Sequence, residues 1–418
     1  MTGCTVKELC AAVGGTLLRE SGAVVTQVST DSRSIPNRAL FVPLVGERFD
    51  GHDYLDAALE RGAAGCLTAR KPASLLPDKF YIQVSDTLEA LKALAAWYRA
   101  KFDIPMVQVT GSAGKTTTKE MIAAVLSQRF STLKTQANFN NAIGTPMTLL
   151  NLAPEHQAAV IETGMNHFGE IRYLGEMVRP TVAVITNVGD AHIENLGGTR
   201  QGILQAKCEI FENLQPGGLA VLNGDDELLS GLALPFKTVL CGRHERCGVR
   251  VTNVAEHGIE GVTCTVTTKR DVYEVSIPFP GAYMIYPAAM AIAIGEHLGL
   301  TKAELLSGIA AYRPVGSRMH LVRCCGGRII IDDCYNANPQ AMAEALRILA
   351  QTEHPRRMAV LGDMGELGDL TEQAHRDMGA LTRTLGLDTV VAVGPKAKAI
   401  QDANPDVLWF PTVADALS

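Results

Sequence analysis

The sequence predicts an α/β protein of three domains, with a parallel sheet and its phosphate-binding loop in the central one. Strand-like runs of β-branched residues alternate with helical patterns along most of the 418 residues, and such alternation indicates mainly parallel sheets. At residues 107–118 a β-branched run, a glycine-containing turn and a helical pattern follow one another. This order is typical of a loop that holds phosphate groups.

The turn of this loop carries the residue types that phosphate binding requires. Gly111 and Gly114 allow the backbone to approach an anion, and the N–H groups at the helix start face it. Lys115 can reach the outer phosphates of a nucleotide, and the Thr116 hydroxyl can bind Mg²⁺. The spacing G-x-x-G-K-T is two residues shorter than the general pattern. An ordinary glycine-rich turn is the alternative, and the flanking strand and helix disfavour it.

Composition narrows the class of protein. Hydrophobic residues make up 47% and charged residues 20% of the chain, as in soluble globular enzymes. The net charge of -6 gives no reason to expect a nucleic-acid partner. The first residues lack a basic segment followed by an apolar run, so no signal peptide is expected. The apolar runs are too short for membrane insertion, and the cysteines form no C-x-x-C pair. We therefore expect a cytoplasmic protein with reduced thiols.

Two further side chains are expected at the edge of the sheet where the loop lies. Residues 158–161 and 181–186 have the pattern of buried strands, and Glu162 and His192 follow them. Because the carboxyl ends of parallel strands share one edge, both side chains should lie near the loop. A carboxylate there can hold Mg²⁺ beside a triphosphate, and an imidazole can bind a second metal ion or its surrounding ligands. Isolated Glu and His residues are otherwise ordinary surface groups.

Lys207 lies on the apolar face of a helix predicted over residues 203–214, with Glu209 on the opposite face. A lysine in such a position usually extends its ammonium group to water. A buried amine instead has a lowered pKa and can take up CO₂ as a carbamate, which would be an anionic metal ligand. The pattern alone leaves both interpretations open and favours the first.

The order of predicted strands and helices divides the chain into three domains, which are residues 1–84, 85–312 and 313–418. The first is a small α/β domain, in which Asp31, Ser32 and Arg33 suit the binding of hydroxyl and phosphate groups, although an ordinary turn has the same composition. The central domain carries the loop. The third alternates strands near residues 328–333, 358–363 and 389–394 with helices, which predicts a smaller, Rossmann-like parallel sheet.

Several segments together resemble the Mur ligases, which join amino acids or peptides to UDP-linked muramic acid. The segments that carry the resemblance are the loop residues 110–117 and residues 138–146, 187–192, 206–211, 332–339 and 362–368. The segment ending Asn336-Ala337-Asn338-Pro339 is the most specific. Within the family, these segments resemble the ligases that add D-alanyl-D-alanine to UDP-N-acetylmuramoyl-tripeptide. The resemblance implies ATP and Mg²⁺ as cofactors, an acyl-phosphate intermediate, closure of the third domain over the site, and a monomer.

The resemblance also implies roles for individual residues. Those implied to bind ATP are Gly111, Ser112, Ala113, Gly114, Lys115, Thr116 and Thr117, with Arg318 and Asp333 closing onto it. Those implied to hold magnesium are Thr116, Glu162, His192 and a carbamylated Lys207, and Lys115, Glu162, His192 and Lys207 are the implied catalytic residues. Those implied to bind substrates are Asp31, Ser32 and Arg33 for the uridine nucleotide, Asn140 and Asn141 along the muramyl tripeptide, and Tyr335, Asn336 and Asn338.

The chain departs from the family pattern at two places. The family carries His-Asn-x-x-Asn after a Pro-Gly on the adenine side, whereas residues 282–287 here contain Tyr283 and Tyr286. Either tyrosine is expected to stack on the base or to fill the core. The sequence stops at Ser418 without the family's closing segment, as in a short form or a fragment.

Other functions stay open from the sequence. They are a related Mur-type or folylpolyglutamate-type ligase with another amine, a P-loop kinase or nucleotide switch, and a nucleotide-binding homologue that has lost catalysis. The third residue of the tripeptide, diaminopimelate or lysine, is not specified by the sequence.

Overall fold

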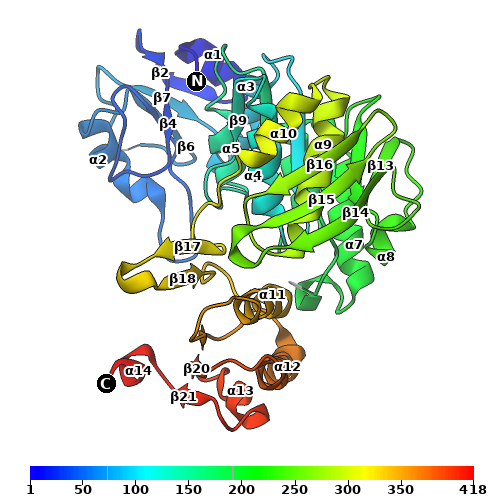
Figure 1. Ribbon diagram of the computed structural model, residues 1–418. Helices are drawn as coiled ribbons and strands as arrows, with labels where there is room; N and C mark the ends of the chain where they lie inside the picture. The colour runs from blue at the N-terminus through cyan, green and yellow to red at the C-terminus, as the bar shows by residue number, and fades with distance from the viewer. Residues whose placement is uncertain (73, 191–192) are drawn as a thin grey trace.

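The computed structural model describes residues 1–72, 74–190 and 193–418. Figure 1 shows three successive parts of the chain, each with its own sheet or sheets. The blue N-terminal part lies beside the large central sheet, and the orange and red C-terminal part lies below both. The α/β class predicted from the sequence is confirmed. Among the helices of the described residues, none is long and apolar enough to cross a membrane.

The N-terminal part centres on a sheet with the strand order β2-β7-β6-β5-β4. Strands β4 to β7 pair in parallel, while β2 runs antiparallel to β7. The bounds are β1 Cys4–Thr5, α1 Val6–Ala12, β2 Thr16–Arg19, β3 Val24–Val25, β4 Val28–Ser29, β5 Leu40–Phe41, α2 Leu55–Glu60, β6 Gly65–Thr68 and β7 Phe80–Gln83, with β1 paired to β3.

Helix α3 (Thr87–Arg99) connects the N-terminal part to the central part. It begins at Asp86, whose carboxylate accepts hydrogen bonds from the N–H groups of Leu88 at 2.7 Å and Glu89 at 3.0 Å, as an N-cap does. Its apolar side chains share one core with the N-terminal sheet and with helices α5 (Gly144–Leu149) and α6 (Glu170–Val178). Buried Arg99 donates to the backbone oxygen of Val178 at 2.8 Å. The two parts are therefore packed together rather than joined by a free linker.

The central sheet has the strand order β16-β15-β14-β13-β12-β11-β8-β10-β9. Strands β8 to β14 pair in parallel, and β14, β15 and β16 pair antiparallel, which confirms the mainly parallel sheet. The bounds are β8 Met106–Thr110, β9 Thr132–Lys134, β10 Ala158–Glu162, β11 Val182–Ile185, β12 Leu219–Asn223, β13 Lys237–Gly242, β14 Val249–Glu256, β15 Val262–Thr267 and β16 Val272–Ile277.

Helices cover both faces of this sheet. The helix bounds not given above are α4 Lys115–Leu126, α7 Arg200–Cys208, α8 Glu227–Ser230, α9 Ile285–His297 and α10 Lys302–Ala310. Along β11, Val182 and Val184 face the core with α4, α9 and α10, whereas Ala183 and Ile185 face the core with α6 and α7. This alternation follows the two-residue period of a strand. Burial on both faces explains why its strands are apolar runs.

The C-terminal part corrects one prediction. Its parallel sheet has the order β19-β20-β21, but the predicted strand near residues 328–333 is not part of it. That strand, β18 (Ile329–Asp332), pairs antiparallel with β17 (His320–Arg323). The turn between them contains Gly326 and Gly327, both with positive φ, a conformation that favours a hairpin. The remaining bounds are α11 Pro339–Ala350, β19 Met358–Leu361, α12 Thr371–Thr384, β20 Thr389–Val393, α13 Lys398–Ala403, β21 Leu408–Phe410 and α14 Val413–Leu417. The domain boundaries near 84 and 312 fall between elements and stay predictions.

Gly308 allows α10 to pack closely on α4, the helix that starts at the phosphate loop. A Cβ at Gly308 would lie 2.4 Å from Val125 Cα. We expect Gly308→Ala to lower the free energy of unfolding by about 1–3 kcal/mol, because backbone atoms cannot yield as a flexible side chain can. Thermal unfolding of the full chain measures this change. Ser307→Ala, at the exposed neighbouring position on the same helix, serves as the control and should change little. Equal thermal unfolding midpoints for the two variants would show that α4 and α10 can move apart at no cost, and would contradict this prediction.

Candidate functional site

The phosphate-binding loop connects β8 to α4. Gly114 has a left-handed backbone, with φ of 77°, and precedes the first residue of α4. At Gly111 a Cβ would lie 1.8 Å from Thr186 Oγ1, so no side chain fits there. The two glycines thus allow a tight turn and a close approach of two backbone segments. The N–H groups of the first helical turn have no intrahelical acceptor, and they favour an anion.

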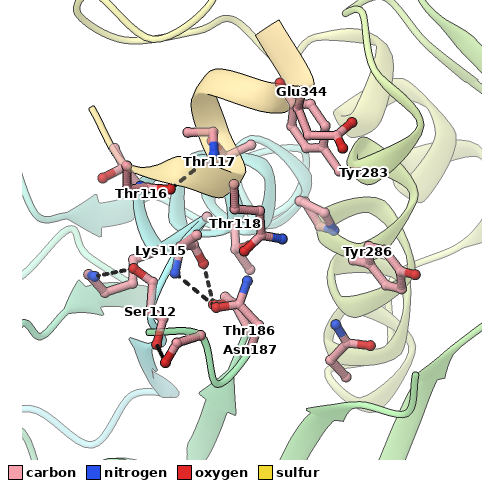
Figure 2. A pocket seen from close by; sticks show the side chains of 18 of the residues that line it. Ser112, Lys115, Thr116, Thr117, Thr118, Thr186, Asn187, Tyr283, Tyr286 and Glu344 are labelled. Carbon is pink, nitrogen blue, oxygen red and sulfur yellow. Dashed lines mark hydrogen bonds between the residues drawn. The ribbon is translucent and has the colours of Figure 1, made fainter. Parts of the chain in front are cut away.

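Residues that follow β11 hold this loop in place. The N–H of Ser112 donates to the backbone oxygen of Asn187 at 3.1 Å, and the N–H of Ala113 donates to Asn187 Oδ1 at 2.8 Å. The Thr186 hydroxyl donates to the backbone oxygen of Ala113 at 2.6 Å. Figure 2 shows Thr186 and Asn187 directly beside the loop. The shape of the loop is therefore fixed before any ligand binds.

Lys115 folds back over the loop. Its Nζ donates to the backbone oxygens of Gly111 at 2.8 Å and Ser112 at 3.4 Å. Burial lowers the pKa of the Lys115 ammonium group, Glu162 opposes this change and Arg318 adds to it. The two carbonyl contacts hold the Lys115 ammonium group at the loop, where it can bind a phosphate oxygen.

A cavity of about 880 Å³ lies between the loop and the C-terminal part. It brings together residues that the sequence analysis assigned to ATP or substrate binding. These are Ser112, Ala113, Gly114, Lys115, Thr116, Thr117, Arg318, Asp333, Asn336 and Asn338. Gly111, also assigned to ATP binding, does not line the cavity. Glu344 of α11 and two tyrosines form the opposite wall (Figure 2).

Tyr283 and Tyr286 line this cavity and also pack against the core of the central sheet. The Tyr286 hydroxyl donates to Asp225 Oδ2 at 3.0 Å, and burial raises its pKa to about 12. A Cβ at Gly281 would lie 2.4 Å from the Tyr283 ring, so glycine leaves room for that ring. The two interpretations made from the sequence, a stacking surface and a core filler, are therefore compatible.

The C-terminal residues at the cavity form a small cluster. The guanidinium carbon of Arg318 lies 4.3 Å from the centre of the Tyr335 ring, within the range of a cation–π contact. Tyr335 is exposed and lines a neighbouring cavity instead. Asp333 accepts a hydrogen bond from the N–H of Met319 at 2.9 Å, and burial raises its pKa to about 6. Asn338 caps α11 through the N–H of Ala341 at 2.9 Å.

Glu162 ends β10, next to the end of β8, as predicted. The residue is 1% exposed, and its Oε1 accepts a hydrogen bond from Asn140 Nδ2 at 2.8 Å. Its Oε2 is buried and has no hydrogen bond from the described residues, which leaves oxygen lone pairs for a cation. Among the described residues, no three acidic, histidine or cysteine side chains converge as in a preformed metal site. This suits Mg²⁺, which takes part of its ligands from phosphates and water. His192 lies outside the described residues.

Lys207 is 2% exposed, so its amine does not extend to water. Burial, together with the charge of Lys115, places its pKa well below the ordinary value. The described residues provide no hydrogen bond or ion pair to the amine. The predicted helix is shorter than expected, because α7 ends at Cys208. Glu209 is buried instead of facing water, and its carboxylate accepts from the N–H groups of Gly169 at 2.7 Å and Arg172 at 3.2 Å.

The remaining predicted substrate residues lie away from the cavity around the loop. Arg33 pairs with Asp31 through two hydrogen bonds of 2.9 Å, and these hold the pKa of Asp31 at about 2. The backbone oxygen of Ser32 accepts from Arg61 at 3.1 Å. Asn141 is exposed and accepts from the N–H of Gly144 at 2.8 Å, at the start of α5. These contacts neither support nor exclude the roles expected for them.

Sequence reasoning missed two groups of residues at this site. Thr186 and Asn187 hold the loop, and their position after a predicted strand at the same edge was an available signal. Lys119 and Glu120 are buried, and Lys119 lies between Glu120 and Glu162. A Lys-Glu pair one turn after Lys115, directly before the apolar run of residues 121–126, was the only sign of them.

Asp333 should give the stability of the chain a pH dependence. Its pKa rises from 3.8 in the unfolded chain to about 6, so between these values the folded state binds more protons and stability falls as the pH rises. The full cost is present above pH 6. We expect Asp333→Asn to raise stability by about 1–2 kcal/mol at neutral pH, after allowance for solvent screening, and by nothing near pH 4.

Thermal unfolding at the two pH values measures this difference. Asp332→Asn is the matched control, because hydrogen bonds, the largest from Cys334, lower the pKa of Asp332. Loss of the Asp332 carboxylate in this variant should destabilise the chain at neutral pH and not at low pH. A gain for Asp333→Asn that is equal at both pH values would contradict the assignment.

Known families match the chain over nearly its whole length. Residues 24–99 match a model described as Mur ligase family, catalytic domain, residues 109–295 match Mur ligase middle domain, and residues 317–418 match Mur ligase, glutamate ligase domain. UDP-N-acetylmuramoyl-tripeptide–D-alanyl-D-alanine ligase of Bacillus subtilis is 37% identical, over 93% of this chain and 85% of that protein. The Escherichia coli ligase of the same name is also 37% identical, over 97% and 89%.

Solved structures agree with these matches. MurF from Acinetobacter baumannii superposes with a TM-score of 0.93 and 33% identity, covering 100% of this chain and 91% of that one. MurF ligase from Thermotoga maritima in complex with ADP has a TM-score of 0.81 and 28% identity, covering 92% and 87%. The relatives and the loop, cavity and buried lysine described above lead to the same conclusion: the chain belongs to the Mur ligase family.

Proposed function

We propose that this chain is an ATP-dependent ligase that adds D-alanyl-D-alanine to UDP-N-acetylmuramoyl-tripeptide, a step of peptidoglycan precursor synthesis. Membership of the family makes it a ligase that forms a carbon–nitrogen bond. The observation that carries the proposal is the cavity between the phosphate loop and the C-terminal residues Arg318, Asp333 and Asn336. The curated relatives that match over most of the chain carry this name. Membership of the Mur ligase family disfavours the alternative functions of a kinase or a nucleotide switch.

ATP is proposed to bind in the cavity. The N–H groups at the start of α4 and the Lys115 ammonium group would hold its phosphates. The wall formed by Tyr283 and Tyr286 would receive the base, and Arg318 and Asp333 would reach the nucleotide from the C-terminal part. A related ligase has been solved in complex with ADP, which supports a nucleotide in this cavity.

The residues at the sheet edge fit magnesium. Thr116 supplies a hydroxyl in the cavity, and Glu162 has a buried oxygen to which the described part of the chain donates no hydrogen bond. His192 is a further candidate. When bound, magnesium would neutralise the charge that develops on the transferred phosphate. Glu162 would be the carboxylate ligand, held at its other oxygen by Asn140.

Lys207 is proposed to carry a carbamate. Its amine is buried and has a lowered pKa, so the neutral, nucleophilic form is favoured. The amine nitrogen would bond to the carbon of CO₂ and lose one proton, which gives an anion beside the positive charge of Lys115. The modification would thus turn a neutral buried amine into a charged partner for Lys115.

The chemistry would proceed in two steps. The terminal carboxylate of the tripeptide attacks the γ-phosphate of ATP, ADP leaves, and an acyl phosphate forms. Lys115 would stabilise the charge of the transition state. The amine of the dipeptide then attacks the acyl phosphate, and phosphate leaves as the amide forms. Water must be kept from the acyl phosphate, so movement of the C-terminal part toward the loop is expected.

We further infer a monomer that works in the cytoplasm. The residues proposed to lie along the two substrates are Asp31, Ser32, Arg33, Asn140, Asn141, Tyr335, Asn336 and Asn338.

Phosphate release from ATP tests the function directly. With Mg²⁺, UDP-N-acetylmuramoyl-tripeptide and D-alanyl-D-alanine, we expect release together with a new amide-linked product, and little release when either substrate is omitted. Lys115→Met should lower kcat by about 100- to 1000-fold, because one donor to the transferred phosphate is lost. Unfolding midpoints control for structure. Phosphate release that is independent of both substrates would refute the ligase function for this chain.

The carbamate makes a separate prediction. Removal of dissolved CO₂ and bicarbonate should lower the ligase rate, and added bicarbonate should restore it. With ¹³C-labelled bicarbonate, the wild-type chain should show a bound carbamate carbon by NMR, and Lys207→Met should not. The variant should fold at least as well, because a buried amine is replaced by an apolar side chain of similar length. A carbamate signal that persists in the variant would place the modification elsewhere.

A further inference from the structure

A fully buried lysine lies beside the carboxylate proposed to bind magnesium. Lys119 is on α4, one helical turn after Lys115, and its side chain has no exposed surface. Its Nζ donates to the backbone oxygen of Thr135 at 2.7 Å and lies 3.6 Å from Glu162 Oε2. A buried ammonium group is costly unless charged and polar partners surround it closely. The arrangement around Lys119 supplies such partners.

Four charged side chains, two of each sign, form this cluster: Lys119, Glu120, Lys134 and Glu162. Lys119 Nζ lies 3.1 Å from Glu120 Oε1, and Lys134 pairs with the other oxygen of Glu120. Lys134 is partly exposed, whereas the other three side chains are buried. Since Lys134 already balances Glu120, the charge of Lys119 is available to balance Glu162.

Lys119 also fixes the backbone next to Glu162. Thr135 follows β9, and its backbone oxygen accepts from Lys119 while its hydroxyl accepts from the N–H of Glu162 at 3.0 Å. One residue thus connects the phosphate-loop helix with the end of β10. Among the described residues, Asn140 provides the one hydrogen bond to the Glu162 side chain. Without Lys119, that amide would be the one polar contact that the described part of the chain gives this carboxylate.

We propose that Lys119 is a positioning residue for the magnesium site: it holds the Glu162 carboxylate oriented toward the phosphate loop before metal and nucleotide bind. The inference rests on the proposed role of Glu162 as a metal ligand. The two ammonium groups and two carboxylates leave the cluster without net charge, which limits its repulsion of the cation. The loss of a group that orients a metal ligand typically weakens metal binding by about 10- to 100-fold.

The test measures metal binding rather than turnover. Mn²⁺ replaces Mg²⁺ as the probe, and its free concentration is followed by electron paramagnetic resonance with the full chain and ADP. We expect Lys119→Met to weaken Mn²⁺ binding about tenfold or more. Lys134→Met is the matched control, since it removes the same charge from the same cluster without a contact to Glu162, and it should change the affinity less than about twofold. In EDTA, which removes the metal, the affinity for ADP should be the same in Lys119→Met and Lys134→Met.

A second pair of variants keeps the test decisive if Lys119→Met does not fold. Lys119→Met combined with Glu120→Gln removes one charge of each sign, which buried clusters tolerate better than the loss of one partner. This double variant should show the same weakening, while Glu120→Gln alone should not.

The outcomes separate the two proposals. Unchanged Mn²⁺ affinity in Lys119→Met, or an equal loss in Lys134→Met, would overturn the positioning role. Glu162→Gln is the reference for the metal ligand and should weaken binding at least as strongly. If Glu162→Gln leaves Mn²⁺ binding intact, the proposed metal role of Glu162 fails, and the role of Lys119 fails with it. Loss in Glu162→Gln but not in Lys119→Met would refute only the present inference.

Discussion

The contact between the phosphate loop and the segment after β11 determines the geometry of the whole site. Gly111 approaches Thr186 so closely that a Cβ would lie 1.8 Å from its hydroxyl, and Asn187 binds two N–H groups of the loop. This contact requires β8 and β11 to be parallel neighbours that end at one edge. The same strand order places β10, and with it Glu162, on the other side of β8. Anion-binding amides and a buried carboxylate therefore meet at one edge.

The site is divided between two parts of the chain, and each contributes groups of different character. The central part provides a fixed loop and buried charges balanced within the protein. The C-terminal part provides Arg318 and Asp333. Asp333 is half-buried, and this burial raises its pKa. A carboxyl group that is poorly satisfied in the folded chain is available to a ligand that supplies a hydrogen-bond donor or a cation. Burial of this kind lowers stability and prepares a group for binding.

Local rules predicted the parts of the structure that depend on local sequence. The loop, the strand before it and the position of Glu162 followed from a glycine turn and from the shared edge of parallel strands. The burial of Lys207 was open, because an apolar helix face allows an amine either to reach water or to stay inside. The partner of β18 was mispredicted, because a run of isoleucines fits either a parallel sheet or a hairpin, and Gly326 and Gly327 decided between them. Lys119 was missed, because Thr135 after β9 and Glu162 at the end of β10 lie far from it in the sequence and no spacing relates them.

The tyrosines on the base side indicate where the binding energy for the proposed nucleotide must come from. Asp225 already accepts hydrogen bonds from Tyr286 at 3.0 Å and from the N–H groups of Arg243 at 2.8 Å and His244 at 2.9 Å. Its carboxylate is thus committed to the protein and is poorly placed to read the edge of a base. An aromatic surface contributes stacking energy that differs little between bases. If the base lies against these tyrosines as proposed, phosphate contacts at α4 and at Lys115 would supply most of the specific interaction. A site built in this way would distinguish triphosphates from other ligands more strongly than one purine from another.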